Sequence, residues 1–535
     1  MLIVFPVALY SQVIQDWVNR YNGPGNSFDI ISELISDNQN NVYVYGSSVG
    51  ENTLTDLTIV KYSSNGEQKW VMRYNGKGNS IDQINSASTD NSGNSYVTGF
   101  TTDSSMVTVF TTAKIDSSGN LLWIKTFSGT GFNYGSGQSI SVDNSGNAVA
   151  AGFMRNLSGY FEIAVIKYSS GGNLLASEFY SGAVPGNSLP VSLKTDSFNN
   201  VIVAGTSAAI SGSEDIVLLK FDSLLNLIDE DSFNGTANQN DKVSDIVVDQ
   251  ENNVFVCGSL FNTSYLSDYF IAMIDRLGII QWSLNINGSG NSYDFANSIS
   301  VNDSFVYVTG SGRSDTSLGS EDFLTIKLNK TGAIIWTSVY NGNSGGSDYG
   351  NAVATDYAGN VYTGGASDRG NNQMTYALLK YNSSGILQWV KNYSVAEIPE
   401  DFIYGLVIDT SGNIIVSGIS IGINTDYDFA TIKYSQLVNV NENSSEYPES
   451  FFLYQNYPNP FNPNTTIRFR IARSDYVSLK LYDMLGNQVS ELINRKMNPG
   501  IYEKEFDGSN LPSGVYFYKL ETAQFKDVKR MVLIK

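Results

Sequence analysis

The chain repeats itself along most of its length, with a period of 53 residues and one unit of 54. The phrase WVNRYNGPGNSFD at residues 17–29, for example, returns as WVMRYNGKGNSID at residues 70–82. A period of this length indicates that one small unit of structure recurs and that neighbouring units bury each other's apolar faces. All six tryptophans fall on one position of the repeat, which we call the Trp position. Its eight members are Trp17, Trp70, Trp123, Ala176, Asp229, Trp282, Trp336 and Trp389.

A second position of the repeat carries lysine inside phrases such as IVKY and TIKL, and we call it the Lys position. Its eight members are Lys61, Lys114, Lys167, Lys220, Met273, Lys327, Lys380 and Lys433. The two positions therefore agree on eight units.

Each unit reads as four short strands. The last complete unit shows them at residues 387–393, 402–409, 414–420 and 428–434. Four strands in a period of about 50 residues are typical of a β-propeller. We therefore predict an all-β chain that contains an eight-bladed β-propeller; an open β-solenoid is the alternative. The array begins with a strand that carries the Trp position and ends with one that carries the Lys position. We therefore also expect residues 17–21 to pair with residues 429–434 and close the ring.

Three phrases of the array carry a resemblance to a known family. They are SASTDNSGNSYVTG at residues 86–99, SISVDNSGNAVAAG at 139–152 and AVATDYAGNVYTGG at 352–365. These phrases resemble the bacterial β-propeller repeat that is often described as seven-bladed, so seven blades is the alternative to the eight counted here. The resemblance implies an extracellular or envelope propeller and brings no catalytic residues with it.

The two ends of the chain differ from the array. The opening MLIVFPVALYSQ resembles the apolar and cleavage regions of a secretory signal peptide, without the basic segment that normally precedes them. We assign residues 1–12 to a signal peptide remnant, with a true start upstream or a buried strand as alternatives. The propeller is expected at residues 13–434, a polar linker at 435–450, and a small antiparallel, immunoglobulin-like β-sandwich at 451–535.

Residues 451–535 strongly resemble the C-terminal sorting domain (type A) of the type IX secretion system. The matching phrases are YPNPFNP, LYDMLGNQV, LPSGVYFYKL and the terminal KRMVLIK. The family implies export, contact with the type IX machinery, and then attachment to the cell surface or release. The motif residues are Tyr457, Pro458, Asn459, Pro460, Phe461, Asn462, Pro463, Gly486, Gly514, Lys529 and Lys535.

Composition excludes several classes of function. The formal net charge of -20 repels phosphate backbones, so we expect no nucleic-acid partner. The chain has no histidine, which removes the commonest general base and metal ligand. Its single cysteine, Cys257, allows no internal disulfide and is expected to be a buried strand residue. No segment is long and apolar enough to span a membrane.

Acidic residues recur at three positions of the repeat. The turn aspartates precede tight turns and are expected to accept backbone N–H bonds there; they are Asp37, Asp90, Asp143, Asp196, Asp249, Asp356 and Asp409, with Asn302 in the remaining unit. Another set, which we call the third set, lies just before the strand that carries the Lys position and is expected on the solvated rim. Its members are Asp56, Glu162, Asp215, Asp268, Asp322 and Asp428.

The remaining set, which we call the strand-start aspartates, opens the second strand of six units. Its members are Asp29, Asp82, Asp241, Asp294, Asp348 and Asp401. In a propeller they are expected near one mouth of the channel, where a ring of carboxylates would bind Ca²⁺ or hydrogen-bond sugar hydroxyls. The alternative is a further set of solvated or capping aspartates.

We predict an exported cell-surface or secreted binding or adhesion module for a glycan, protein or matrix ligand. We assign no catalytic residue, no metal and no cofactor. The alternatives are a polysaccharide hydrolase or lyase that works with carboxylates, and a purely structural surface component. A unique acidic pair at the channel would favour the enzyme, but the many acids of the repeat do not single one out.

Overall fold

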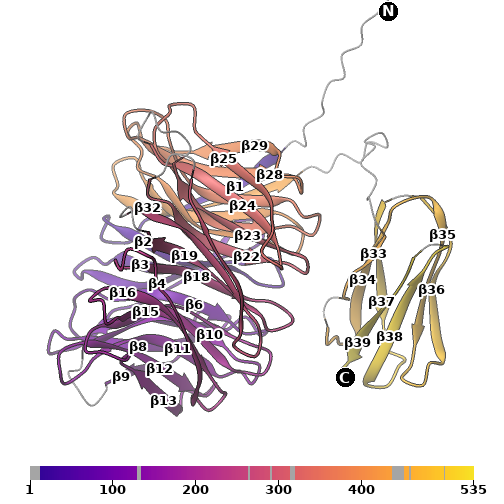
Figure 1. Ribbon diagram of the computed structural model, residues 1–535, viewed down its shortest axis with the longest axis horizontal. Coiled ribbons are helices and arrows are strands. Elements are labelled where there is room, and N and C mark those ends of the chain that lie inside the picture. The colour runs from indigo at the N-terminus through magenta and orange to yellow at the C-terminus, as the bar shows by residue number, and fades with distance from the viewer. Residues whose placement is uncertain are drawn as a thin grey trace, which may run out of the picture. The chain divides into compact units, whose positions relative to one another are not determined.

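The computed structural model describes residues 13–128, 134–262, 266–288, 292–313, 320–436, 451–456, 459–498, 500–523 and 525–535. Every regular element in these residues is a β-strand (Figure 1). A helix long and apolar enough to cross a membrane is absent from them. The chain divides into two compact units, residues 1–438 and 439–535. We describe each unit by itself.

The described part of the first unit contains eight four-stranded antiparallel sheets. Sheet 1 contains β2 (Asp29–Ser36), β3 (Val42–Val49), β4 (Thr55–Tyr62) and β5 (Gln68–Tyr74); sheet 2 contains β6 (Gln83–Thr89), β7 (Ser95–Thr102), β8 (Thr108–Ile115) and β9 (Leu121–Phe127). Sheet 3 contains β10 (Gly135–Val142), β11 (Ala148–Arg155), β12 (Phe161–Tyr168) and β13 (Leu174–Tyr180); sheet 4 contains β14 (Ser188–Thr195), β15 (Val201–Ala208), β16 (Glu214–Phe221) and β17 (Leu227–Phe233).

The later sheets follow the same plan. Sheet 5 contains β18 (Lys242–Val248), β19 (Val254–Phe261), β20 (Ser267–Ile274) and β21 (Ile280–Ile286); sheet 6 contains β22 (Phe295–Val301), β23 (Phe305–Gly312), β24 (Asp322–Asn329) and β25 (Ile334–Tyr340). Sheet 7 contains β26 (Asp348–Thr355), β27 (Val361–Asp368), β28 (Met374–Tyr381) and β29 (Leu387–Tyr393); sheet 8 contains β30 (Phe402–Ile408), β31 (Ile414–Ile421), β32 (Tyr427–Gln436) and β1 (Val13–Tyr21).

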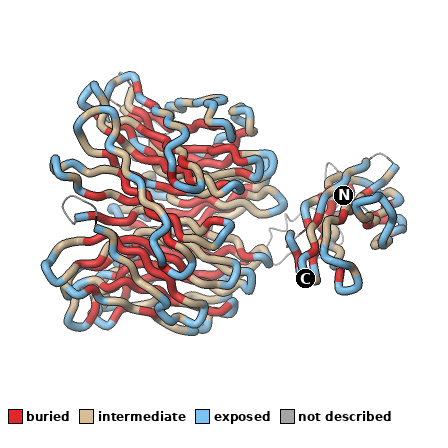
Figure 2. Tube along the Cα trace, turned by 90° about the horizontal axis from the view of Figure 1, so that it is seen from below, coloured by how far each residue is buried: buried red, intermediate tan, exposed pale blue. Residues whose placement is uncertain are grey.

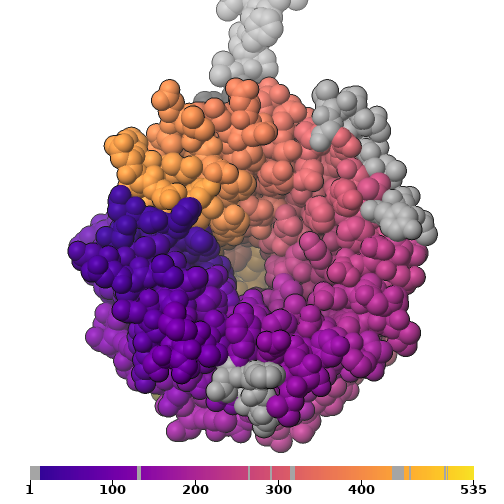
Figure 3. All heavy atoms as spheres, turned by 90° about the vertical axis from the view of Figure 1, so that its left-hand side faces the viewer, coloured from indigo at the N-terminus to yellow at the C-terminus, as the bar shows by residue number. Residues whose placement is uncertain are grey.

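Sheet 8 joins the two ends of the repeat array. Strand β1 pairs antiparallel with β32, with Trp17 opposite Lys433 and Tyr21 opposite Phe429. The pairing of residues 17–21 with residues 429–434 is thus confirmed. The first strand of each sheet contacts the first strand of the next, and β30 of sheet 8 contacts β2 of sheet 1. The sheets therefore follow one another around a central opening, which Figure 3 shows.

Buried residues lie along the strands, whereas exposed residues gather at the turns (Figure 2). Each hydrophobic cluster spans two neighbouring sheets, because one sheet alone cannot cover its apolar faces. Cys257, as expected, is buried in the cluster between sheets 5 and 6, beside Tyr269 and Val308.

The Trp and Lys positions hold neighbouring sheets together. Within each sheet the two residues lie directly opposite each other on the outer two strands, as Lys61 and Trp70 do. Both donate to one carbonyl in a turn of the next sheet: Trp70 Nε1 lies 3.2 Å and Lys61 Nζ 3.1 Å from the Ser117 oxygen. The same turn bends at Gly119, whose φ of +91° is unfavourable for other residues and whose Cα lies against the Trp70 indole.

One sheet departs from this arrangement and compensates for it. Sheet 5 has Met273 at the Lys position, so no ammonium group comes from its own third strand. Lys330 of sheet 6 reaches back instead, and its Nζ lies 2.8 Å from the carboxylate of the turn aspartate Asp249. In sheet 3, by comparison, the regular Lys167 makes this contact with Asp143.

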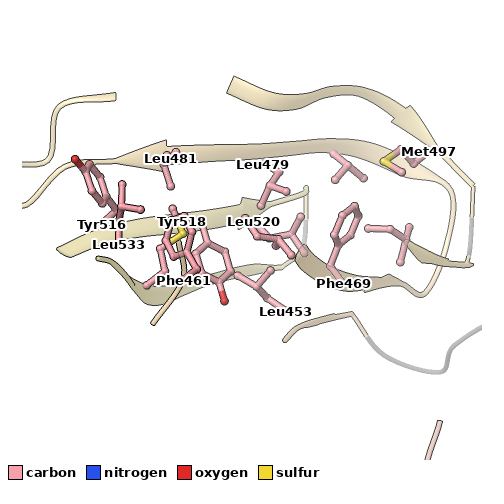
Figure 4. Packing of buried hydrophobic residues seen from close by; sticks show 14 residues of the cluster. Leu453, Phe461, Phe469, Leu479, Leu481, Met497, Tyr516, Tyr518, Leu520 and Leu533 are labelled. Atoms are coloured by element: carbon pink, nitrogen blue, oxygen red, sulfur yellow. The ribbon is translucent and has the colours of Figure 1, made fainter. Parts of the chain in front are cut away.

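The C-terminal unit contains two antiparallel sheets over one core. One sheet has the order β33 (Phe452–Leu453), β34 (Asn464–Ile471), β37 (Gly500–Asp507), and the other has the order β36 (Gln488–Met497), β35 (Asp475–Tyr482), β38 (Gly514–Glu521), β39 (Lys526–Leu533). Side chains from both sheets, among them Phe469 and Leu520, meet between them (Figure 4).

The expected boundaries fall partly outside the described residues. The signal peptide assigned to residues 1–12 lies outside the described residues. The same is true of residues 437–450 of the expected linker. The rest of that linker, Ser435 and Gln436, belongs to strand β32, which pairs with Val13 and Ile14 as far as its end.

Candidate functional site

The six strand-start aspartates lie where the innermost strands begin, and their side chains are buried. In five of them one carboxylate oxygen accepts a hydrogen bond from the N–H of a glycine six residues earlier in the chain. Asp401 has Val395 at that place and accepts from the N–H of Ile421 instead, at 3.0 Å. The nitrogen–oxygen distances are 2.7 Å for Gly23 and Asp29, 2.8 Å for Gly235 and Asp241, and 2.7 Å for Gly342 and Asp348. A Cβ at Gly23 would stand 1.9 Å from Ser48 Oγ, so the loop needs glycine there for close approach.

In several of these aspartates the second carboxylate oxygen accepts a hydrogen bond from a backbone N–H at the far end of the neighbouring strand. Asp82 accepts from the N–H of Thr102 at 2.7 Å, and Asp241 accepts from that of Phe261 at 2.8 Å. Each such aspartate therefore ties the loop from the previous sheet to two strands of its own sheet. Among the described residues, no group of three or more His, Cys, Asp and Glu side chains is placed to hold a metal ion.

Burial also controls the ionisation of these carboxyl groups. Loss of hydration raises the pKa of Asp29, Asp241, Asp348 and Asp401 to about 6, although the hydrogen bonds they accept act in the opposite direction. These six side chains thus lie inside the protein, where they accept hydrogen bonds from backbone N–H groups.

The turn aspartates occupy the tight turns as expected. Each accepts from the backbone N–H groups two and four residues later, at 2.8–3.0 Å. Burial alone would raise the pKa of Asp143, but the ion pair with Lys167 and the bonds from Asn147 outweigh it and hold that pKa below its usual range. The turn-capping prediction is confirmed.

The expectation that the third set lies on the solvated rim is wrong for four of its six members. Asp56, Asp268, Asp322 and Asp428 are buried. Arginine side chains cover two of them: Arg73 lies 2.8 Å from Asp56, and Arg20 lies 2.8 Å from Asp428. A guanidinium group can stabilise a carboxylate away from water, which the position in the repeat alone did not reveal.

Every innermost strand contains a β-bulge, which the sequence pattern did not reveal. The extra residue often bridges to the next sheet: Asn85 donates to the Gly137 carbonyl at 2.6 Å, and Asn297 donates to that of Gly350 at 2.8 Å. The bulge also decides which residue comes next on each wall of the central opening. Around the eight sheets these following residues are Glu33, Ser86, Ser139, Ser192, Asp245, Ser298, Ala352 and Gly405.

Two carboxylates stand out in this circle of small residues. Glu33 lies on β2 of sheet 1 and Asp245 on β18 of sheet 5, the innermost strands of two sheets that are four places apart in the circle. Lys194, exposed on the innermost strand of sheet 4, carries no hydrogen bond or ion pair in the described structure. Burial raises the pKa of Glu33 to about 7; the Lys194 ammonium opposes this shift and the Asp245 carboxylate adds to it.

The end of the channel where the innermost strands begin, which we call the mouth, is apolar on one side. Phe295, Tyr349, Phe402 and Ile30 occupy one repeat position in four consecutive sheets, from sheet 6 around to sheet 1. Tyr404 adds a ring that is 46% exposed and stacks near Phe402. These five residues are the aromatic mouth. In sheets 2 to 5 the same position carries Gln83, Ser136, Leu189 and Lys242, and the Lys242 ammonium lies 6.0 Å from the centre of the Phe295 ring in the neighbouring sheet.

In the C-terminal unit, the first motif lies against the last strand. Asn459 Oδ1 accepts from the N–H of Val532 at 2.8 Å, and the backbone of Phe461 bonds to Val532 and Ile534 at 2.9 and 3.0 Å. Tyr457 and Pro458 lie outside the described residues; Pro460, Asn462 and Pro463 complete the segment. Gly486 forms a turn with φ of +83°, Gly514 opens β38, Lys529 lies on β39, and Lys535 Nζ donates to Ser509 at 2.6 Å.

Comparison with protein families gives one match. Residues 455–535 match the family described as the secretion system C-terminal sorting domain. No curated protein matches the chain.

Comparison with solved structures gives matches of low identity and low TM-score. PorZ, a bacterial surface component of the type IX secretion system of Porphyromonas gingivalis, is 14% identical, with 96% of this chain and 75% of that one covered and a TM-score of 0.31. A fungal alcohol oxidase of the AA5 family, in complex with copper, is 10% identical over 98% and 99% of the two chains, with a TM-score of 0.41. The α-L-arabinanase of Penicillium chrysogenum is 12% identical over 55% and 91%, with a TM-score of 0.33.

Proposed function

We propose that this protein is an exported binding module that takes a glycan at the mouth of its ring of sheets. Its C-terminal type IX secretion system sorting domain indicates delivery to the cell surface or the extracellular space and contact with the type IX machinery. The ligand and the binding role rest on the geometry of the first unit.

We propose that the first unit, residues 13–434, is an eight-bladed β-propeller. Eight successive four-stranded sheets support this count, as does the completion of sheet 8 by β1. We likewise propose an immunoglobulin-like sandwich at residues 451–535 after a linker at 435–450, supported by two sheets around one core. The apolar start of the chain is proposed as a signal peptide remnant, in keeping with export.

The aromatic mouth is the single observation that carries the binding function. Tyr404 and Ile30 are 46% and 45% exposed, and Phe295, Tyr349 and Phe402 are half-buried, so apolar side chains from four consecutive sheets gather on one side of the opening. Aromatic faces attract the C–H groups of sugar rings, and the polar opposite side offers hydrogen-bond donors and acceptors for hydroxyl groups.

The strand-start aspartates are proposed as structural residues of this module. Each accepts at least one backbone hydrogen bond through a buried carboxylate oxygen, and Ca²⁺ bound at that oxygen would have to displace the bond. In the C-terminal unit we propose that Asn459 and Phe461 serve sorting by holding β39 in place.

A specific observation favours the polysaccharide hydrolase as second candidate. Glu33 and Asp245 form an acidic pair found in one sheet each, and opposite carboxylates are what acid–base cleavage of a glycosidic bond requires. Asp245, however, already accepts a hydrogen bond from the Ile299 N–H of the next sheet at 3.3 Å, as a linking residue would.

A glycan array on the full chain, followed by incubation with each retained polysaccharide, tests both functions. The binding module retains a polysaccharide and leaves its length unchanged. Release of new reducing ends that disappears in Glu33→Gln would establish the hydrolase instead, and an array without any signal would reject glycan binding.

A further inference from the structure

Five of the six tryptophans close the contact between neighbouring sheets in the same way, and we call each such contact at the Trp position a seam. The indole lies against a glycine in a turn of the next sheet, at Gly66, Gly119, Gly172, Gly332 and Gly385. Its Nε1 donates to the carbonyl two residues before that glycine, at 2.9–3.3 Å. A regular seam therefore holds one ring and one hydrogen bond to it.

The seam between sheets 3 and 4 lacks the tryptophan and is filled from the other side. Ala176 takes the Trp position, but the turn carries Leu225 in place of glycine. Leu225 is 2% exposed and its φ is +69°, so the chain adopts an unfavourable backbone conformation in order to bury an aliphatic side chain there. Ala176 packs against the hydrophobic cluster that contains Leu225. This seam is thus closed without a ring.

The seam between sheets 4 and 5 has neither filling. Asp229 takes the Trp position, and the turn keeps its glycine, Gly278. The Asp229 carboxylate lies directly against this glycine, since a Cβ at Gly278 would stand 1.7 Å from it. Among the described residues, this half-buried carboxylate accepts no hydrogen bond and forms no ion pair. It is a poor substitute for a ring, because a carboxylate loses hydration beside apolar groups.

The carbonyl that serves two donors in a regular seam serves one donor here. Ser117 accepts from both Trp70 and Lys61, at 3.2 and 3.1 Å. Arg276, at the same place in sheet 5, accepts at 2.6 Å from Lys220 alone among the residues that the structure describes. A carbonyl oxygen has two lone pairs. The Arg276 carbonyl therefore retains the acceptor that an indole N–H uses in the regular seams.

A hollow marks the place of the missing ring. Apolar side chains line it from both sheets, Ile202 and Leu218 from sheet 4 and Val254 and Ile274 from sheet 5, and Asp229 lines it as well. With the Asp229 side chain in place the hollow encloses about 10 Å³, which is the space of one water molecule. A ring can enter when this side chain turns away, and a carboxylate that turns toward water regains its hydration.

We propose that this seam binds a tryptophan side chain presented by a peptide partner. The indole displaces the Asp229 carboxylate toward water, packs between Gly278 and the apolar side chains of the hollow, and donates from Nε1 to the Arg276 carbonyl. An open hollow of about 380 Å³ borders the same turn and takes the peptide backbone beside the ring; polar side chains such as Gln250 and Arg276 line it.

The partner is a different chain, because the six tryptophans of this one already pack in its own hydrophobic clusters. The site lies at the opposite end of the strands from the mouth, at the turn after β20. It is therefore independent of glycan binding.

The test compares two blocked tripeptides by calorimetry on the full chain: glycine–tryptophan–glycine and the same peptide with alanine at its centre. The tryptophan peptide is expected to bind at least about tenfold more tightly, because it adds a buried ring and a hydrogen bond. Asp229→Trp fills the seam from within and should abolish this binding. Its melting temperature should rise, which shows that the variant is folded.

The neighbouring Glu230 supplies the matched controls. It faces sheet 3, where it accepts from the Tyr180 hydroxyl at 2.6 Å, so Glu230→Trp adds the same ring on the other face of the strand and should leave peptide binding intact. Asp229→Ala removes the side chain that has to move and should tighten binding several-fold, an effect that loss of folding could not imitate; Glu230→Ala should not. Equal binding of the two peptides, a preference that persists in Asp229→Trp, or an unchanged affinity in Asp229→Ala would overturn the proposal.

Discussion

Arg20 and Asp428 are 408 residues apart in the chain, yet the guanidinium of Arg20 lies 2.8 Å from the Asp428 carboxylate. Arg20 is on β1 and Asp428 on β32, so this ion pair lies across the junction where the two ends of the repeat array meet. Arg73 and Asp56 form the same pair at the same distance within sheet 1, where both strands belong to one continuous hairpin. The two pairs therefore isolate the effect of ring closure from the effect of the ion pair.

Arg20→Ala and Arg73→Ala are each expected to lower the free energy of unfolding by about 3 kcal/mol, because each leaves a buried carboxylate unpaired. Only Arg20→Ala should also speed amide hydrogen exchange in β1, since β1 has no covalent turn to hold it against β32. Urea unfolding and hydrogen exchange of both variants measure this. Equal exchange of β1 in the two variants would show that the pair has no special part in closure.

The glycine turns allow a prediction about the contact between sheets. Gly119→Ala should destabilise the protein by at least about 1 kcal/mol more than Gly146→Ala, since a clash adds to the backbone strain. Both glycines have a positive φ, of +91° and +77°, but a Cβ at Gly119 would stand 2.8 Å from the Trp70 indole and one at Gly146 would meet nothing within 4 Å. Thermal unfolding of the pair checks it; equal losses would mean that the indole yields freely.

Lys330 of sheet 6 replaces the lysine that sheet 5 lacks at residue 273, and we expect that a lysine at residue 273 can take over its role. Lys330→Met should cost about 2 kcal/mol because it leaves the buried Asp249 without its ammonium partner. Adding Met273→Lys to that variant restores a lysine at the regular position and should recover most of the loss. Denaturant unfolding of the single and double variants decides; a double variant no more stable than Lys330→Met would contradict the compensation.

Stability should fall as the pH rises from about 4 to about 6. The pKa of Asp29, Asp241, Asp348 and Asp401 is about 6 in the folded protein, above the value of about 3.9 in an unfolded chain. The folded state therefore holds protons that the unfolded state has released, and each such proton lowers the free energy of unfolding by about 1.4 kcal/mol per pH unit.

Above about pH 7 this contribution should level off. Urea unfolding between pH 4.5 and 8 measures the slope, and Asp348→Asn should make it shallower by removing one titrating group. A wild-type stability that rises with pH over this interval would refute the assignment. Below about pH 4 stability should fall again, because Asp143 and Asp249, whose pKa values are held low mainly against the effect of burial, then lose their ion pairs.

Export should depend on the contact between the first motif and the last strand. Deletion of residues 528–535 removes most of β39 and is expected to leave the protein in the periplasm, whereas Asn459→Ala, which removes the bond to Val532, should reduce surface display in part. Asn494→Ala, on the exposed strand β36, is the matched control. Cell fractionation and surface labelling measure both effects; normal display of the deletion would refute the role of β39.

The sequence predicted those contacts of the fold that recur in nearly every unit of the repeat. The Trp and Lys positions led to the number of units and to the pairing of β1 with β32 because each contact recurs in nearly every unit. The sequence pattern wrongly placed Asp56 and Asp428 on the solvated rim, because the repeat position of these residues does not show that Arg73 and Arg20 cover them. Such partners become visible only when the strand that carries them is placed.

The candidate site was harder to predict, for a physical reason. For the strand-start aspartates the sequence left a ligand site and a capping role open. A glycine six residues before Asp29 marks the loop that its carboxylate holds, and this spacing recurs at Gly76, Gly235, Gly288 and Gly342. Glu33 and Asp245 could not be singled out because a β-bulge shifts the alternation of the innermost strands. Without the bulge their side chains cannot be assigned to the channel wall.

The binding function has one most direct measurement, the retention of a polysaccharide found on the array by the full chain and by two matched variants. Tyr404→Ala removes a tyrosine of the aromatic mouth that is 46% exposed, and Tyr357→Ala removes one that is 62% exposed in a turn at the opposite end of the strands. We expect Tyr404→Ala to lose most of the retention and Tyr357→Ala to keep it. Equal retention by both variants would contradict binding at the mouth.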